Sequence, residues 1–268
     1  MTVNGSRPIA GSRFAPGTFE PAPRPAAPTA MLAAQTRMEL ILLLRNGEQL
    51  LLTMLIPIAL LVGLSLLPIG DYAETRANVF VPAIMAVALT STAFTGQAIA
   101  VGFDRRYGAL KRLGATPLPR WGIIGGKTLA VVAVVILQSV ILGLIGAALG
   151  WRPHAPGLVI GAVVLAVGIF AFSSLGLLLG GTLKAEVVLA LANLLWFALA
   201  AIGSLVVMQH RVPGAALTVA RLIPSGALTN ALTAATDRGS IDWFGLIVLV
   251  IWGITGAAAA VRLFRFTG

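Results

Sequence analysis

The sequence has no cysteine and few charged residues. Of its 268 residues, 10% are Asp, Glu, Lys or Arg and 58% are hydrophobic, whereas a soluble domain carries about 25% charged residues. The lack of cysteine excludes disulfides, zinc-thiolate sites, iron–sulfur clusters and a cysteine nucleophile. So little charge cannot cover the surface of a soluble enzyme of this length, and the composition therefore indicates an integral membrane protein.

Long apolar runs bounded by charged residues indicate the spans, since crossing the hydrocarbon core takes about 20 apolar residues. A further run, between Arg221 and Asp237, is too short to cross and contains Pro224, so residues 212–236 are expected to form a re-entrant or outer segment. The expected fold is an all-α membrane protein with six transmembrane helices. We place these spans at residues 49–70, 78–102, 124–150, 157–183, 187–208 and 243–261.

The part before the first span divides in two. Residues 1–29 are rich in Pro, Ala and Gly and lack the apolar core of a signal peptide, so we expect a disordered cytoplasmic tail. Residues 30–47 have an amphipathic pattern, with Arg37 and Arg45 on one arc and Glu39 on the far side. We interpret them as an interfacial helix on the inner membrane surface. An early extension of the first span is the alternative.

Lys and Arg are unevenly divided between the two sides of this topology. With the N-terminus inside, 14 of the 19 fall on the inner side and five on the outer side, as the positive-inside rule requires. Both termini are then cytoplasmic. The net charge of +10 follows mostly from topology, so no nucleic-acid partner is expected. The excess of Arg over Lys and the abundance of Ala indicate a bacterial plasma membrane.

No Asp, Glu, Lys or Arg lies inside the apolar runs that define the spans, and the two histidines, His154 and His210, fall at their outer ends. This argues against a proton relay, an ion-coupled transporter or a voltage sensor. No metal-ligand cluster or nucleophile–base motif is evident, so we predict no catalytic residue and no metal site. Residues 122–128 end like a phosphate-binding loop. However, Trp121 stands where that motif requires glycine, and no strand precedes it. This chain is therefore not expected to bind ATP.

The segment between the second and third spans, residues 103–122, is the most informative part of the chain. Leu110 and Leu113 lie among charged residues, and Pro117 and Pro119 end any helix that precedes them. We predict a short charged helix that projects from the membrane and docks into a cleft of a soluble partner. A positive anchor that touches only lipid headgroups is the simpler alternative.

This segment resembles the cytoplasmic loop of ABC-2 type permeases, the membrane subunits of ABC exporters. The resemblance rests on the acidic-Arg-Arg, Leu-Lys-Arg-Leu and Ala-Thr-Pro groups between Asp104 and Pro117, and it extends over nearly the whole chain after Ala30. Two departures are Asp104, where Glu is commoner, and the long tail. The resemblance implies a coupling helix at residues 104–116 and a connecting helix, both touching a separate cytoplasmic ATPase. The implied coupling residues are Asp104, Arg105, Arg106, Tyr107, Gly108, Leu110, Lys111, Arg112 and Leu113, with Arg37, Glu39 and Arg45 in the connecting helix.

The resemblance also implies an assembly of two permeases and two ATPases, in which the partner holds ATP and Mg²⁺ and this chain is not an enzyme and binds no cofactor. Whether the second permease is another copy or a paralogue is left open. Spans two and five would face the path. An apolar path with hydroxyl and amide groups suits export of a hydrophobic or amphipathic substrate, such as a drug or a lipid. The implied path residues are Thr90, Thr95, Gln97, Asn193, Trp196 and Phe197.

Two other functions stay open at this point. A non-catalytic membrane scaffold or assembly factor would need the charged loop only as an anchor, and would tolerate charge reversal there. A membrane enzyme would use an outer-face site near His154, His210 and Ser225.

Overall fold

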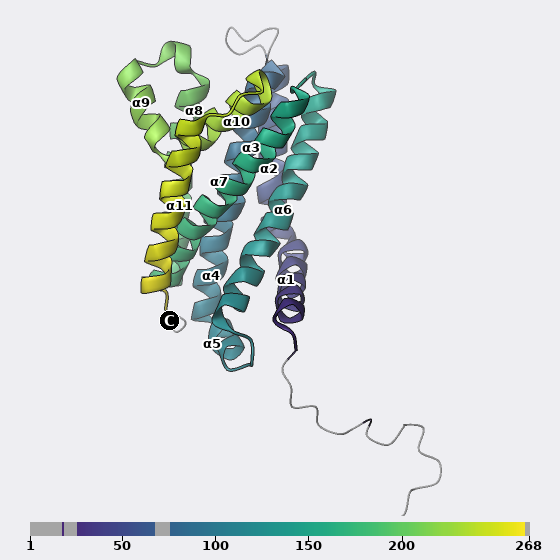
Figure 1. Cartoon of the computed structure of the whole chain (residues 1–268), viewed down its shortest axis with the longest axis vertical. Coiled ribbons are helices and arrows are strands. Elements are labelled where there is room, and N and C mark those ends of the chain that lie inside the picture. The colour runs from purple at the N-terminus through teal and green to yellow at the C-terminus, as the bar shows by residue number, and fades with distance from the viewer. Residues whose placement is uncertain (1–17, 19–25, 68–75, 266–268) are drawn as a thin grey trace, which may run out of the picture.

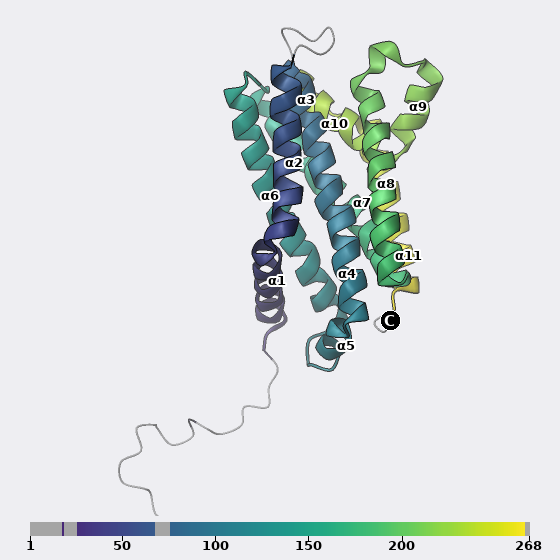
Figure 2. The ribbon, with the colours of Figure 1, turned by 180° about the vertical axis from the view of Figure 1, so that it is seen from behind.

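The computed structural model describes Thr18, residues 26–67 and residues 76–265, and every regular element among these residues is helical. Figures 1 and 2 show a bundle of long helices, with α5 at one end and α10 at the other. The tail expected at residues 1–29 lies almost wholly outside the described residues. The elements are α1 (Pro28–Arg45), α2 (Gly47–Leu66), α3 (Arg76–Leu89), the π-helix η1 (Thr90–Gly96), α4 (Gln97–Arg106), α5 (Ala109–Gly114), α6 (Arg120–Ala148), α7 (Ala155–Thr182), α8 (Ala185–Val207), the short 3₁₀ helix η2 (Gln209–Arg211), α9 (Gly214–Leu222), α10 (Pro224–Arg238) and α11 (Trp243–Leu263).

Five helices in the described part of the chain are long and apolar enough to cross a membrane. The second expected span is the longest of them, because α3, η1 and α4 form one continuous helix. For the first expected span, the described apolar stretch of α2, Thr53–Leu66, is shorter than a full span, so this sixth crossing stays a prediction. The five long helices are Arg76–Arg106, Arg120–Ala148, Ala155–Thr182, Ala185–Val207 and Trp243–Leu263.

The segment before the last span forms two helices, α9 and α10. They meet at Ile223, whose extended backbone is followed by Pro224 at the first position of α10, where proline needs no donor. Leu228 and Leu232 of α10 are fully buried, and the helix packs against α3, α7, α8 and α11. Figure 1 shows α10 at the end of the bundle opposite α5. The helix α10 is therefore part of the core at that end, whereas α9 is mostly exposed and buries only Ala220.

Buried polar groups and small residues hold the second span against its neighbours. The Thr92 hydroxyl donates to Gln138 Oε1 of α6 (3.0 Å), and Gln138 Nε2 donates to the carbonyl oxygen of Thr53 in α2 (3.0 Å). On the other side, the glycine at position 180 lets α7 pack closely against α4. Any side chain there would clash, since a Cβ on Gly180 would lie only 2.4 Å from the Ala98 carbonyl oxygen. Part of the polar content of this span thus serves helix packing.

Candidate functional site

Three consecutive residues at the end of α4, here called the terminal triad, connect the second span to three other helices. Asp104 Oδ2 lies 2.5 Å from Lys127 Nζ of α6. Arg105 Nη1 donates to the carbonyl oxygens of Gly180 and Leu183, both at 2.9 Å, at the end of α7. Arg106 forms a half-exposed ion pair with Glu186 at the start of α8. This end of α4 is therefore linked directly to α6, α7 and α8.

Lys127 extends this network to α1. Its Nζ lies 2.8 Å from Glu39 Oε2, and Gln35 Nε2 donates to the other oxygen of the same carboxylate at 2.8 Å. The side chains of Lys127 and Glu39 are only 10% and 8% exposed. Charges this well buried require a partner, because desolvation of an unpaired ion is costly. The ion cluster of Glu39, Asp104 and Lys127 thus ties α1, α4 and α6 together.

A close contact between α1 and α6 places Glu39 beside Lys127. A Cβ on Gly126 would lie 2.4 Å from Gln35 Cγ, and a Cβ on Gly125 would lie 3.3 Å from Leu32 Cδ1. Glycine at these two positions therefore lets α1 lie directly on the α6 backbone. The Gly-Gly-Lys run that resembles the end of a phosphate-binding loop has this packing role.

The short helix α5 follows the terminal triad after a break at Gly108. The φ of Gly108 is 70°, a left-handed conformation that favours glycine. Leu110 is 1% exposed and packs in a cluster with Ile123 of α6 and Leu177 of α7. Tyr107, by contrast, is 65% exposed, and Lys111 and Arg112, which follow Leu110, are exposed as well. We call Lys111 and Arg112, together with Tyr107 just before the helix, the exposed face of α5.

The residues implied for ATPase contact therefore divide into two groups. Asp104, Arg105 and Leu110 point toward neighbouring helices of the same chain and contact them, and Leu113 is half-buried. The helix implied at residues 104–116 is interrupted at Gly108, because residues 104–106 still belong to α4. The exposed members are Arg106, Tyr107, Lys111 and Arg112 in the loop, and Arg37 and Arg45 in α1, whose Glu39 is buried.

The six implied path residues are not brought together within one chain. Thr90 and Trp196 line a small cavity with Ser225 of α10. Gln97 lines a different one beside Glu39 and Lys127, and its side-chain amide has no hydrogen-bond partner among the described residues. The Thr95 hydroxyl lies 3.5 Å from the Ala192 carbonyl oxygen, while Asn193 and Phe197 are exposed on α8.

The outer-face residues do not form a catalytic arrangement in the described part of the chain. Ser225 lies at the start of α10, whereas His154 lies against Gly239, just past the end of that helix. The helix between them is about 20 Å long at ~1.5 Å per residue. His154 is therefore too far from Ser225 to act as its general base. The side chain of His210 lies outside the described part of the structure. No cluster of three metal-ligating side chains occurs in residues 26–67 and 76–265.

The sequence interpretation missed the inward orientation of Asp104 and Arg105 and the pairing of Lys127 with Glu39. One signal for the pairing was present. Glu39 lies on the face of its helix opposite Arg37 and Arg45, which places an acid toward the protein. Lys127 lies near the start of the third expected span, and nothing in the sequence indicates its partner.

Comparison with known proteins identifies the family. Residues 62–262 match the family described as ABC-2 family transporter protein, which is well over half of the chain. No curated protein matches the sequence. The match covers every long span together with the terminal triad and α5, and members of this family have no ATPase site of their own. The chain therefore belongs to the ABC-2 family of transporter membrane proteins.

Proposed function

We propose that this chain is the permease subunit of an ATP-driven exporter, moved by a separate cytoplasmic ATPase that docks on the exposed face of α5. The observation that carries the proposal is the arrangement of α4 and α5. One side of α5 is exposed and cationic, while the residues just before it connect to α1, α6, α7 and α8.

This arrangement suits the transmission of motion. Leu110 anchors α5 in the cluster with Ile123 of α6 and Leu177 of α7. A displacement of α5 would therefore also displace these parts of α6 and α7. Arg105 reaches the end of α7, and the ion cluster reaches α1. Packed helices and buried ion pairs move as units, because partial separation leaves unpaired polar groups in an apolar surrounding. ATP binding by the partner would in this way change the relative positions of the spans.

Two further features of the proposal concern the path. We propose that two permease subunits pair through faces that include the exposed side of α8, where Asn193 and Phe197 lie. The candidate path residues are all uncharged, which suits a hydrophobic or amphipathic substrate, since a charged substrate needs buried counter-charges. Export across a bacterial plasma membrane, with both termini cytoplasmic, agrees with the excess of Lys and Arg at the α5 end.

The docking of the ATPase is tested by reversing the charge on the exposed face of α5. We expect the double variant Lys111→Glu, Arg112→Glu to lose most of the ATPase that co-purifies with the tagged chain from native membranes in mild detergent. Both side chains are exposed, so the free energy of unfolding is expected to change by no more than about 0.5 kcal/mol. The matched control is Arg262→Glu, an exposed cation at the end of α11.

The outcomes separate the functions that the sequence left open. A stoichiometric ATPase that is lost in the double variant and kept in the control supports the exporter. A chain that purifies without any ATPase, or whose partners are unchanged by the double variant, contradicts this docking surface and favours the membrane scaffold.

A further inference from the structure

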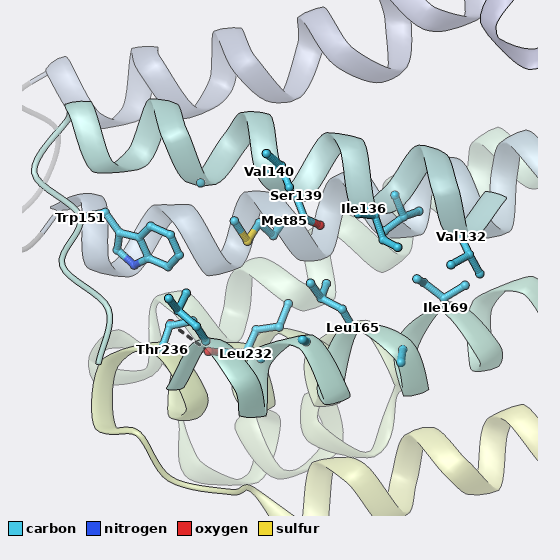
Figure 3. A pocket seen from close by; sticks show the side chains of 16 residues that line it. Met85, Val132, Ile136, Ser139, Val140, Trp151, Leu165, Ile169, Leu232 and Thr236 are labelled. Carbon is cyan, nitrogen blue, oxygen red and sulfur yellow. Dashed lines mark hydrogen bonds between the residues drawn. The ribbon is translucent and has the colours of Figure 1, made fainter. Parts of the chain in front are cut away.

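A groove of about 560 Å³ lies between α6 and α7. The two helices are consecutive but make few contacts with each other. Figure 3 shows the groove between them, with Trp151 at one end and Val132 and Ile169 at the other. Met85 of α3 and Leu232 of α10 also line it.

The length of the groove matches one half of a membrane. On α6 the lining positions recur along one helix face from Val132 to Gly143, which is a rise of about 16 Å. On α7 they recur from Leu158 to Ile169, which is the same length. The hydrocarbon core is about 30 Å thick, so one leaflet accounts for roughly half of it. Because Trp151 and α10 lie at the end opposite α5, the groove belongs to the leaflet on that side.

The groove opens sideways between the two spans. Ile136 and Val140 at its edge are 56% and 53% exposed, and the lining is almost wholly apolar. In the hydrocarbon core, the medium that reaches such an opening consists of lipid chains. Water in the groove would find too few polar partners to be held there.

A cation marks the Trp151 end. Arg152 is exposed, and its Nη1 donates to the carbonyl oxygens of Ala147 and Trp151, both at 2.9 Å. These two bonds hold the guanidinium at the end of α6, beside the groove. Trp is enriched at membrane interfaces, where headgroups lie, and a guanidinium there attracts an anionic phosphate.

We propose that this groove binds one acyl chain of an anionic phospholipid from the leaflet at the α10 end, with the headgroup phosphate at Arg152. The apolar walls hold the chain by contact area, and the Arg152 charge selects the headgroup. The site is separate from the proposed path at α8, and it does not depend on the partner ATPase.

Photo-crosslinking of the full chain in vesicles tests the proposal. The probe is phosphatidylglycerol with a photoreactive group in its acyl chain, diluted in phosphatidylcholine, and peptide mass spectrometry maps the labelled residues. We expect label on the groove-facing positions of α6 and α7. Excess unlabelled phosphatidylglycerol should remove it, and added phosphatidylcholine should not.

Matched variants make the test specific. Ala162→Phe fills the groove and should abolish labelling there, whereas Val159→Phe introduces the same side chain at an exposed position of α7 outside the groove and should leave the labelling unchanged. Ser139→Phe on the opposite wall replaces Ala162→Phe if that variant does not fold. Arg152→Gln should weaken competition by phosphatidylglycerol about fivefold, the effect of one basic residue near an anionic headgroup.

Three outcomes would overturn the proposal. Label spread evenly over the exposed faces of α6 and α7 would mean only bulk lipid contact. Equal labelling of the Ala162→Phe and Val159→Phe variants would mean that the groove is not the site. An unlabelled groove in a chain that crosslinks to a second copy would mean that protein covers it.

Discussion

Replacing Lys127 with methionine is expected to lower the free energy of unfolding by about 3–5 kcal/mol, because it leaves the carboxylates of Glu39 and Asp104 without their counter-charge. Glu39 is buried in the contact between α1 and α6, and Asp104 lies at the end of α4. Both have Lys127 Nζ as a partner, at 2.8 and 2.5 Å. The loss is measured on the purified chain by titration with a denaturing detergent.

Two controls separate the ion cluster from the loss of any lysine. The triple variant Glu39→Gln, Asp104→Asn, Lys127→Met should recover most of the lost stability, because no uncompensated charge is left. Lys184→Met, at an exposed lysine before α8, should stay within about 0.5 kcal/mol of the wild type. A Lys127→Met variant as stable as the wild type would contradict the cluster.

Replacing Arg105 with methionine is expected to cost about 3 kcal/mol, since it removes two hydrogen bonds from a charged donor. The carbonyl oxygens of Gly180 and Leu183, at the end of α7, then lose the donor that lies 2.9 Å away. Unpaired carbonyls in a buried site favour local opening of the last turn. Hydrogen exchange at the amides of that turn should therefore accelerate.

The adjacent residue supplies the control for Arg105. Arg106 makes a half-exposed ion pair with Glu186, and such pairs contribute at most about 1 kcal/mol. Arg106→Met should therefore leave the stability and the exchange at the end of α7 nearly unchanged. If both variants behaved alike, the two arginines would have equal roles, and the terminal triad would not connect α4 to α7 as described.

Much of the fold follows from composition and hydropathy. Apolar runs bounded by charges predicted the five long helices, because hydrocarbon tolerates only backbone that satisfies its own hydrogen bonds. Pro224 predicted the break before the last span, and Pro117 with Pro119 predicted the end of the short charged helix, although the break at Gly108 that separates α4 from α5 was not predicted. The family was also predicted correctly from the charged loop, as the match to residues 62–262 confirms.

The candidate site was predictable only in its position along the chain. The sequence predicts that residues 103–122 dock a soluble partner. However, the orientations of its consecutive charged side chains are indistinguishable in the sequence, so all of them were expected to lie on one docking surface. Successive residues of a helix point about 100° apart, so Asp104, Arg105 and Arg106 reach three different neighbours. Which neighbour each reaches depends on how α1, α6 and α7 pack around α4, and helix rotation is set by those contacts.

The sequence by itself determined the membrane class, the long helices, the family and the position of the charged segment between the second and third spans, because each depends on the local pattern of apolar and charged residues. Only the tertiary structure decided that Lys127 pairs with Glu39 and Asp104, that α10 is buried, and that α6 and α7 enclose a groove. These features join residues far apart in the chain. Their energies come from desolvation and contact area that exist only once the helices have packed.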